Sequence, residues 1–146
     1  MKAVIAAYIA GIMDGEGCFL IERFATKRSP IGVQYRSSVQ VTMCDRDPIK
    51  FISDATDRHI QVKKLPSGRT AYTLVWRNSF AVSLIKAIRP YLIGKAEQAD
   101  ILLDYEATIA PGRGRTYRPE DKDRCEAARE KLFTIRRVPQ ADTPRC

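Results

Sequence analysis

The chain has little of what zinc, redox and hydrolytic sites commonly use. It has 146 residues, with one histidine (His59) and four cysteines, and no two cysteines form a C-x-x-C pair. The cysteines (Cys18, Cys44, Cys125 and Cys146) are therefore expected to be reduced thiols in an intracellular compartment, and zinc is not expected. A single histidine also argues against a histidine-rich nuclease motif and against a Ser-His-Asp triad.

The sequence also lacks an apolar run of the roughly 20 residues that a membrane-spanning helix needs. Met1 and Lys2, followed by apolar residues, resemble the start of a signal peptide, but no A-x-A-like cleavage site precedes Asp14. We expect an intracellular protein, cytoplasmic or organellar, that is not secreted and has no membrane partner.

Basic residues are in excess. There are 25 Lys and Arg against 17 Asp and Glu, a formal net charge of +8, and 45% of the residues are hydrophobic. Such a chain is long enough for one globular domain, expected over residues 1–137 with a tail at 138–146. The charge favours nucleic acid as a partner, although a basic protein without such a partner is the alternative.

The apolar patterns predict an α+β fold with two hairpins in one antiparallel sheet. After a first helix that ends near Glu16, strands are expected at residues 19–28, 33–43, 60–65 and 69–77. Further helices are expected at residues 47–57, 79–88, 94–110 and 119–137, with Ser79 as an N-cap. A basic loop at 111–115 is interpreted as a phosphate contact or a linker, and Glu120-Asp121-Lys122 as solvated surface.

The first helix carries small residues at intervals of four. Ala3, Ala7, Gly11 and Gly15 line one face, which allows another helix to approach closely. Glu16 follows at the helix C-terminus, where the helix dipole disfavours negative charge, so a cation is expected there. A buried N-terminal helix with a glycine-rich cap is the alternative interpretation.

One face of the strand at 33–43 carries a row of side chains that donate or accept hydrogen bonds: Gln34, Arg36, Ser38, Gln40 and Thr42. Gln and Arg heads match adenine and guanine edges in the major groove, and a two-stranded ribbon fits that groove. An ordinary solvated sheet face is the alternative. The predicted DNA contacts are Glu22, Thr26, Lys27, Arg28, Gln34, Arg36, Ser38, Gln40, Thr42, Lys63, Arg69 and Thr73.

The segment Ile-Ala-Gly-Ile-Met-Asp-Gly-Glu-Gly at residues 9–17 resembles the signature of the LAGLIDADG homing endonucleases. The order of helices and hairpins through about residue 110 is similar too. The resemblance implies an αββαββα core with a saddle-shaped antiparallel sheet, here with an extra C-terminal helix. It implies catalytic roles for Glu16 and Lys95, metal binding by Glu16 and Gly15, and structural support from Asp14. Gln98 fits the pattern less specifically.

The motif occurs once, which implies a homodimer, with Ala7, Ala10, Gly11 and Gly15 at its interface. The expected activity is Mg²⁺-dependent cleavage of both strands of a long pseudo-palindromic DNA site, with Mn²⁺ or Ca²⁺ substituting in binding. Many relatives carry a polar residue where this chain has Met43, and Thr42 or Gln40 could take that role. An RNA-binding intron maturase and a non-cleaving DNA-binding regulator remain alternatives.

Overall fold

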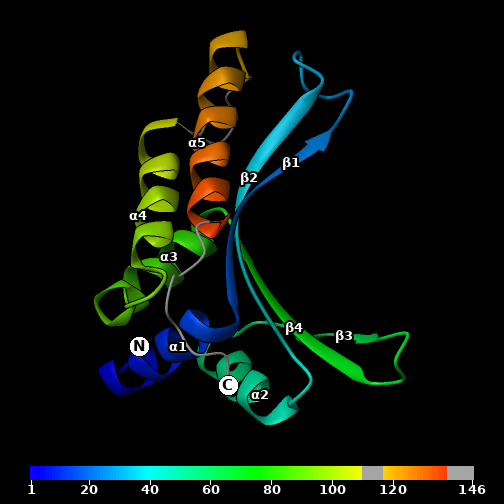
Figure 1. Ribbon diagram of the computed structural model, residues 1–146, viewed down its shortest axis with the longest axis vertical. Helices are drawn as coiled ribbons and strands as arrows, with labels where there is room; N and C mark the ends of the chain where they lie inside the picture. Colours follow the sequence, from blue (N-terminus) through cyan, green and yellow to red (C-terminus); the bar gives the residue numbers. More distant parts are fainter. Residues whose placement is uncertain (110–116, 138–146) are drawn as a thin grey trace.

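The computed structural model describes residues 1–109 and 117–137 (Figure 1). The chain begins with helix α1 (Ala3–Glu16), hairpin β1 (Gly17–Ala25) and β2 (Val33–Met43), helix α2 (Arg46–Thr56), and hairpin β3 (Gln61–Lys64) and β4 (Thr70–Arg77). It continues with α3 (Ser79–Ile88), the short turn η1 (Arg89–Tyr91), α4 (Ala96–Asp104), the π-type turn η2 (Tyr105–Ile109) and α5 (Pro119–Arg137). The predicted α+β class is confirmed.

The strands of the described residues form one antiparallel sheet in the order β1-β2-β4-β3. The β1–β2 and β3–β4 hairpins curve toward the same side at opposite ends of the sheet, and the helices cover the other side (Figure 1). The sheet is therefore the predicted saddle. We call the side away from the helices the outer face, and the side against them the inner face.

The core lies between the inner face and the helices. Phe19, Val39 and Leu74 of the sheet are fully buried there, together with Ile9 and Met13 of α1. Over most of β1 and β2 buried residues alternate with half-buried or exposed ones, so each strand buries one side and leaves the other for the outer face.

Several predicted boundaries move for local reasons. The strand expected at 19–28 covers Gly17–Ala25, because a turn closed by a bond from Thr26 N to Gly32 O ends it early. The helix expected at 94–110 begins at Ala96 and gives way to η2 after Asp104. Asn78, with φ 51°, holds the N-cap position of α3 that was predicted for Ser79. The predicted loop at 111–115 and the tail at 138–146 lie outside the described residues.

No helix in the described part of the chain is long and apolar enough to cross a membrane.

Candidate active site

The C-terminal end of α1 is tied to the segment before α4 by a small network. The Asp14 carboxylate accepts hydrogen bonds from Ile93 N (2.8 Å) and from Lys95 N (2.9 Å). The Lys95 ammonium donates to the carbonyls of Met13 (2.8 Å) and Gly17 (2.7 Å). A cation at these carbonyls complements the negative end of the helix dipole. Asp14 and Lys95 thus fix the C-terminal end of α1 against the segment that precedes α4.

Gly17 lets the helix run directly into β1. A Cβ at this position would lie 2.6 Å from both the carbonyl oxygen and the sulfur of Met13. The φ of Gly17 is −75°, so space and not backbone conformation requires glycine here. Because no loop intervenes, Glu16 is the last residue of α1 and stands directly beside the first residue of the sheet.

Glu16 itself is solvent-exposed, as is Gly15 before it. An exposed carboxylate at this position is accessible to a ligand. No group of three or more His, Cys, Asp or Glu side chains that could hold a metal occurs among residues 1–109 and 117–137. The described part of one chain thus offers no complete set of metal ligands at this place, and a metal there would need further ligands from elsewhere.

The small-residue stripe of α1 faces solvent. Ala3, Ala7, Gly11 and Gly15 are exposed, and a Cβ added to Gly11 or Gly15 would meet no atom of the described residues within 4 Å. Ala10 differs, because its side chain is fully buried in the core of its own chain. Its predicted place at a dimer interface is wrong, since the inner face of the sheet covers that side of the helix.

Large apolar side chains flank the stripe on the same exposed side of the molecule. Val4 is 81% exposed, and Tyr8 stacks edge-on against Phe51 of α2 with the ring centroids 5.1 Å apart. Both rings keep more than a third of their surface exposed. Exposed apolar side chains therefore lie beside the open space at the two glycines.

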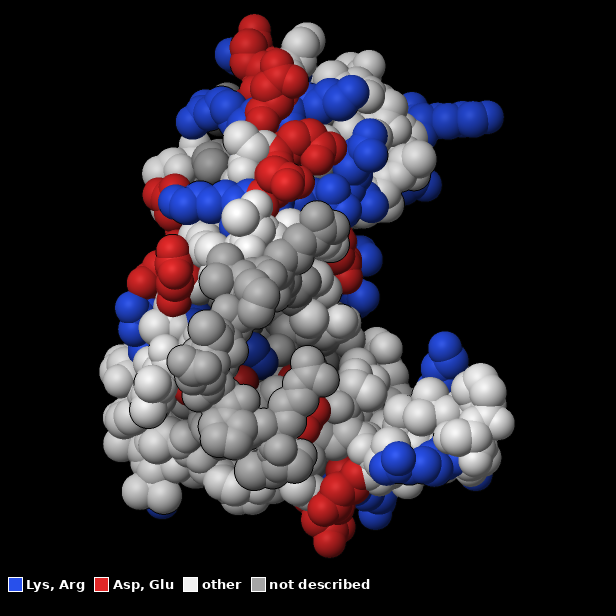
Figure 2. Space-filling model, in the orientation of Figure 1, with Lys and Arg blue, Asp and Glu red and all other residues white. Residues whose placement is uncertain are grey.

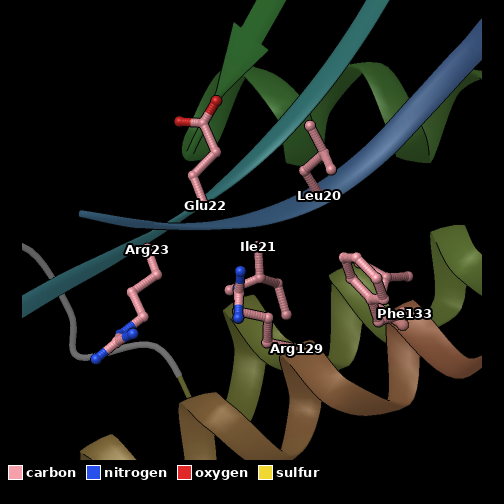
Figure 3. Close-up of a pocket in the computed structure, with 7 residues that line it drawn as sticks. Leu20, Ile21, Glu22, Arg23, Arg129 and Phe133 are labelled. Carbon is pink, nitrogen blue, oxygen red and sulfur yellow. The ribbon is translucent and has the colours of Figure 1, made fainter.

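Most of the predicted row in β2 reaches the outer face. Thr42 is exposed, and Gln34, Arg36 and Gln40 are half-buried. Ser38 is fully buried, so its predicted exposure is wrong. It lies between Leu20 of β1 and Arg77 of β4, directly opposite both in the ladder. Figure 3 shows the same alternation in β1, with Leu20 and Glu22 on one side and Ile21 and Arg23 on the other, toward α5.

The remaining predicted DNA contacts lie in or near the two hairpins. Lys27 and Arg28 are exposed just after β1, in a turn where Arg28 N donates to Thr26 Oγ1 (3.2 Å). Lys63 and Arg69 are exposed at the other hairpin. Figure 2 shows Lys and Arg side chains at both hairpins and the molecule hollowed between them. The Thr73 and Thr42 hydroxyls are 2.8 Å apart and connect β4 to β2 on the outer face.

Arg77 is a residue of the outer face that the sequence prediction missed. Its Nε lies 3.7 Å from Glu22 Oε2, and the same oxygen accepts a hydrogen bond from Arg36 Nε. The Arg36 guanidinium also lies over the Phe24 ring, 5.0 Å from its centroid. The period of two from Thr73 through Val75 could have identified Arg77, because residues two apart share a face.

Three other residues singled out in the sequence are buried or half-buried. Gln98 is 9% exposed and lies within the packed side of α4. Met43 ends β2 half-buried and packs against the core. Asp121 of the Glu-x-Lys segment is buried and accepts a hydrogen bond from Arg118 N (2.8 Å) at the start of α5. The solvated-surface interpretation is therefore wrong for Asp121, which stabilises the helix start.

The inner side between the sheet and α5 holds a polar cluster. The Tyr35 hydroxyl donates to Glu126 Oε1 (2.5 Å), which also pairs with Arg23 Nε at 2.9 Å. The Tyr117 hydroxyl donates to Tyr35 O (2.7 Å) and accepts from Tyr35 N (3.2 Å). Burial, and then the bond to Glu126, raise the pKa of Tyr35 to about 12. This cluster joins α5 to β2.

A pocket of about 260 Å³ lies nearby, between β1 and α5 (Figure 3). Its lining includes Ile21, Arg23, Arg129 and Phe133, and neither Glu16 nor Lys95 contributes to it. Exposed Glu16 and half-buried Lys95 thus lie outside this pocket. That arrangement suits a large substrate better than a small molecule.

No protein-family model matches the sequence, and no curated protein matches it either. Solved structures of homing endonucleases, LAGLIDADG homing endonucleases among them, share the fold of this chain. The homing endonuclease I-CvuI, solved with a DNA target in the presence of Mg, has a TM-score of 0.73 at 18% identity, over 95% of this chain and 86% of that one.

An archaeal intron-encoded homing endonuclease, I-Vdi141I, solved in complex with DNA, has a TM-score of 0.76 at 15% identity, over 99% of this chain and 91% of that one. The LAGLIDADG homing endonuclease I-LtrWI, bound to its target DNA, has a TM-score of 0.60 at 14% identity; 99% of this chain covers 53% of that one. The resemblance predicted from residues 9–17 is thereby confirmed for the fold.

Proposed function

We propose that the protein is a sequence-specific, metal-dependent endonuclease that cuts both strands of DNA as a homodimer. The observation that carries the proposal is the exposed Glu16 at the end of α1, beside the outer face. Similar folds were solved in complex with DNA, one of them in the presence of Mg with its DNA not cleaved. The chemistry of each part supports the same activity.

The outer face fits duplex DNA. Strand β2 has 11 residues, and at about 3.3 Å per residue it spans roughly one helical turn, or about ten base pairs. Side chains of β2 such as Gln34 and Gln40 can reach base edges, while Lys27, Arg28, Lys63 and Arg69 lie at the hairpins where phosphates would pass. The binding should weaken as salt rises.

A second copy of the chain completes the site. The exposed stripe of α1 leaves room for a helix to approach at Gly11 and Gly15, and the apolar side chains around it would be buried on association. Two copies related by a two-fold axis would bring two Glu16 carboxylates together at the centre of a target of about twenty base pairs.

The residues at the end of α1 fit a hard divalent cation such as Mg²⁺. Glu16 supplies an exposed carboxylate, and the carbonyl of Gly15 belongs to the last turn of a helix, where backbone oxygens lack helical partners. When bound, the metal supplies an activated water and stabilises the leaving oxygen of the phosphodiester.

Lys95 is assigned a supporting part in the same reaction. Its ammonium holds the carbonyls of Met13 and Gly17 on either side of Glu16, so it fixes where that carboxylate stands. Its charge also adds positive potential beside the phosphates. Asp14 positions Lys95 through the backbone N–H of that lysine.

The test is cleavage of a selected site. A randomised duplex library is incubated with the protein and Mg²⁺, cut molecules are sequenced, and the recovered site is assayed with Glu16→Gln. We expect cleavage to fall by roughly a thousandfold or more while binding in Ca²⁺ is retained, since the amide keeps the shape but not the charge. Glu130→Gln, an exposed change on α5, is the matched control.

Failure to cut any library sequence would refute the nuclease. Selection of a DNA site without cleavage would instead support the non-cleaving regulator, and selection of RNA over DNA would support the maturase.

A further inference from the structure

On the outer face three charged side chains contact one another: Glu22, Arg36 and Arg77. Glu22 of β1 stands directly opposite Arg36 of β2, and its Oε2 accepts a hydrogen bond from Arg36 Nε. The same oxygen lies 3.7 Å from Nε of Arg77, which reaches it from β4. One carboxylate oxygen thus faces two guanidinium groups from two different strands.

Both guanidinium groups keep part of their surface for another partner. The side chain of Arg36 is 37% exposed and that of Arg77 is 40% exposed, whereas Glu22 is 24% exposed. Each arginine faces Glu22 through its Nε, which leaves its terminal nitrogens as further donors in a fixed plane. Phe24 lies against Arg36 and restricts that plane further.

Two buried polar atoms lie within or next to this cluster. Ser38 Oγ and Arg77 Nε are both buried with no hydrogen-bond partner among the residues that the structure describes. They belong to residues that stand directly opposite each other in the β2–β4 ladder. Both atoms are enclosed by the protein, and Arg77 Nε faces Glu22, so the donors that remain for a ligand are the terminal nitrogens of the two partly exposed arginines.

We infer that Glu22, Arg36 and Arg77 form one base-reading cluster that selects guanine, in which Glu22 orients the arginines and does not read DNA itself. The inference rests on the proposed DNA binding. A planar guanidinium can donate two hydrogen bonds to O6 and N7 of guanine, which is the commonest specific contact in the major groove. A carboxylate on a DNA-binding face repels phosphate, and orienting two arginines explains its presence.

The position of the cluster in the target follows from the strand. Glu22 lies six residues beyond Glu16, or about 20 Å along an extended chain, which corresponds to roughly six base pairs of duplex. Each half-site should therefore prefer guanine about six base pairs from the place where Glu16 acts.

The experiment measures base preference with cleavage prevented. Duplexes bound in Ca²⁺ are selected from a randomised library by the wild type, by Glu22→Gln, by Arg36→Met/Arg77→Met, and by the triple variant. Methionine is used because lysine could still donate to guanine. Glu130→Gln is the control, and thermal melting checks that every variant folds.

We expect the wild type to prefer guanine by tenfold or more at this position, as one bidentate contact gives roughly that discrimination. Glu22→Gln should lower the preference several-fold, the arginine pair should abolish it, and the triple variant should match the arginine pair. Preferences elsewhere in the site should persist in all of them.

Other outcomes overturn the inference in separable ways. If the wild type selects no site, the proposed DNA binding fails and the cluster with it. If the wild type selects a site and the variants keep its guanines, only the cluster is refuted. A further loss from Glu22→Gln on top of the arginine pair would show that Glu22 contacts a base directly, which contradicts its positioning role.

Discussion

Two neighbouring serines in β2 show how differently the faces of the sheet are built. The Ser37 hydroxyl, on the inner face, donates to the carboxylate of Glu106 in η2. The Ser38 hydroxyl, on the outer face, is equally buried and has no hydrogen-bond partner within the described residues. The Ser37 hydroxyl is thus hydrogen-bonded within its own chain, whereas the Ser38 hydroxyl has no partner among the described residues.

The contrast extends beyond the serines. On the inner side, Tyr35, Tyr117 and Glu126 satisfy one another, and the indole nitrogen of Trp76 is an exception without a partner in the described part of the chain. On the outer side, Glu22 pairs with the Nε atoms of Arg36 and Arg77, and the terminal nitrogens of both arginines remain as donors. The side chains of Tyr35, Tyr117 and Glu126 are thus paired by folding alone, whereas the terminal nitrogens of Arg36 and Arg77 are the donors that the proposed DNA contact would use. Variants of the inner face should change stability, and variants of the outer face should change DNA binding.

The largest effect on stability is expected at Gly17, where α1 enters β1. Gly17→Ala would place Cβ against the Met13 backbone, and forced overlap of this kind typically costs about 1–3 kcal/mol of unfolding free energy; the 2.6 Å contacts favour the upper end of that range. Gly11→Ala is the matched control, because its added methyl meets open space within the described residues. Urea unfolding at low protein concentration measures both, and equal stability of the two variants would contradict the close approach.

The next effect is expected from Lys95→Met. This change removes two hydrogen bonds from an ammonium to carbonyls at the end of α1, and we expect a loss of about 2 kcal/mol. Cleavage should fall further than stability explains, while DNA affinity changes little. Comparing single-turnover cleavage with binding in Ca²⁺ measures the split. Unchanged cleavage by a folded variant would remove Lys95 from the reaction.

A smaller difference should separate Tyr117→Phe from Thr42→Val. The first leaves Tyr35 N and O without their partner on the inner side and should cost about 1–2 kcal/mol, with DNA affinity unchanged. The second removes an exposed hydroxyl bonded to Thr73, so stability should stay within about 0.5 kcal/mol while DNA binding weakens. The reverse pattern would break the comparison between the faces.

The smallest effect is a dependence of stability on pH. Because folding raises the pKa of Tyr35 from about 10 to about 12, its contribution is complete below pH 10 and is lost as the pH rises from 10 toward 12. Burial raises the pKa of Tyr105 and of Tyr117 as well. Tyr35→Phe should therefore reduce the alkaline loss without abolishing it. Urea unfolding between pH 8 and 11.5 tests this, and an identical slope in the variant would contradict it.

Period and turn chemistry were enough to predict much of the fold. The strand at Val33–Met43 and the helix at Pro119–Arg137 have the predicted bounds, and the helix that ends at Ile88 begins one residue before its predicted start. The alternation along the strand is long and clear. The exposure of Glu16 and of the α1 stripe also agrees with the sequence interpretation.

What the sequence could not supply depends on distant neighbours. Ser38 is buried because Leu20 and Arg77 stand on both sides of it, which only the strand register determines. Small-residue spacing does not say which side of α1 the sheet covers, so Ala10 was misplaced. The bonds from Ile93 N and Lys95 N to Asp14 join residues about eighty positions apart. They hold the segment just before α4, which begins at Ala96 and not at the predicted residue 94.

The direct junction between α1 and β1 restricts how such a chain can change length. Successive strand residues point to opposite faces, so inserting or deleting one residue between Glu16 and Phe19 would turn Glu22 inward and Ile21 outward. The segment between Ala25 and Val33 has no such constraint, since it lies beyond the strands that it joins. We expect length variation among related sequences to collect there, and the junction at Gly17 to keep its spacing.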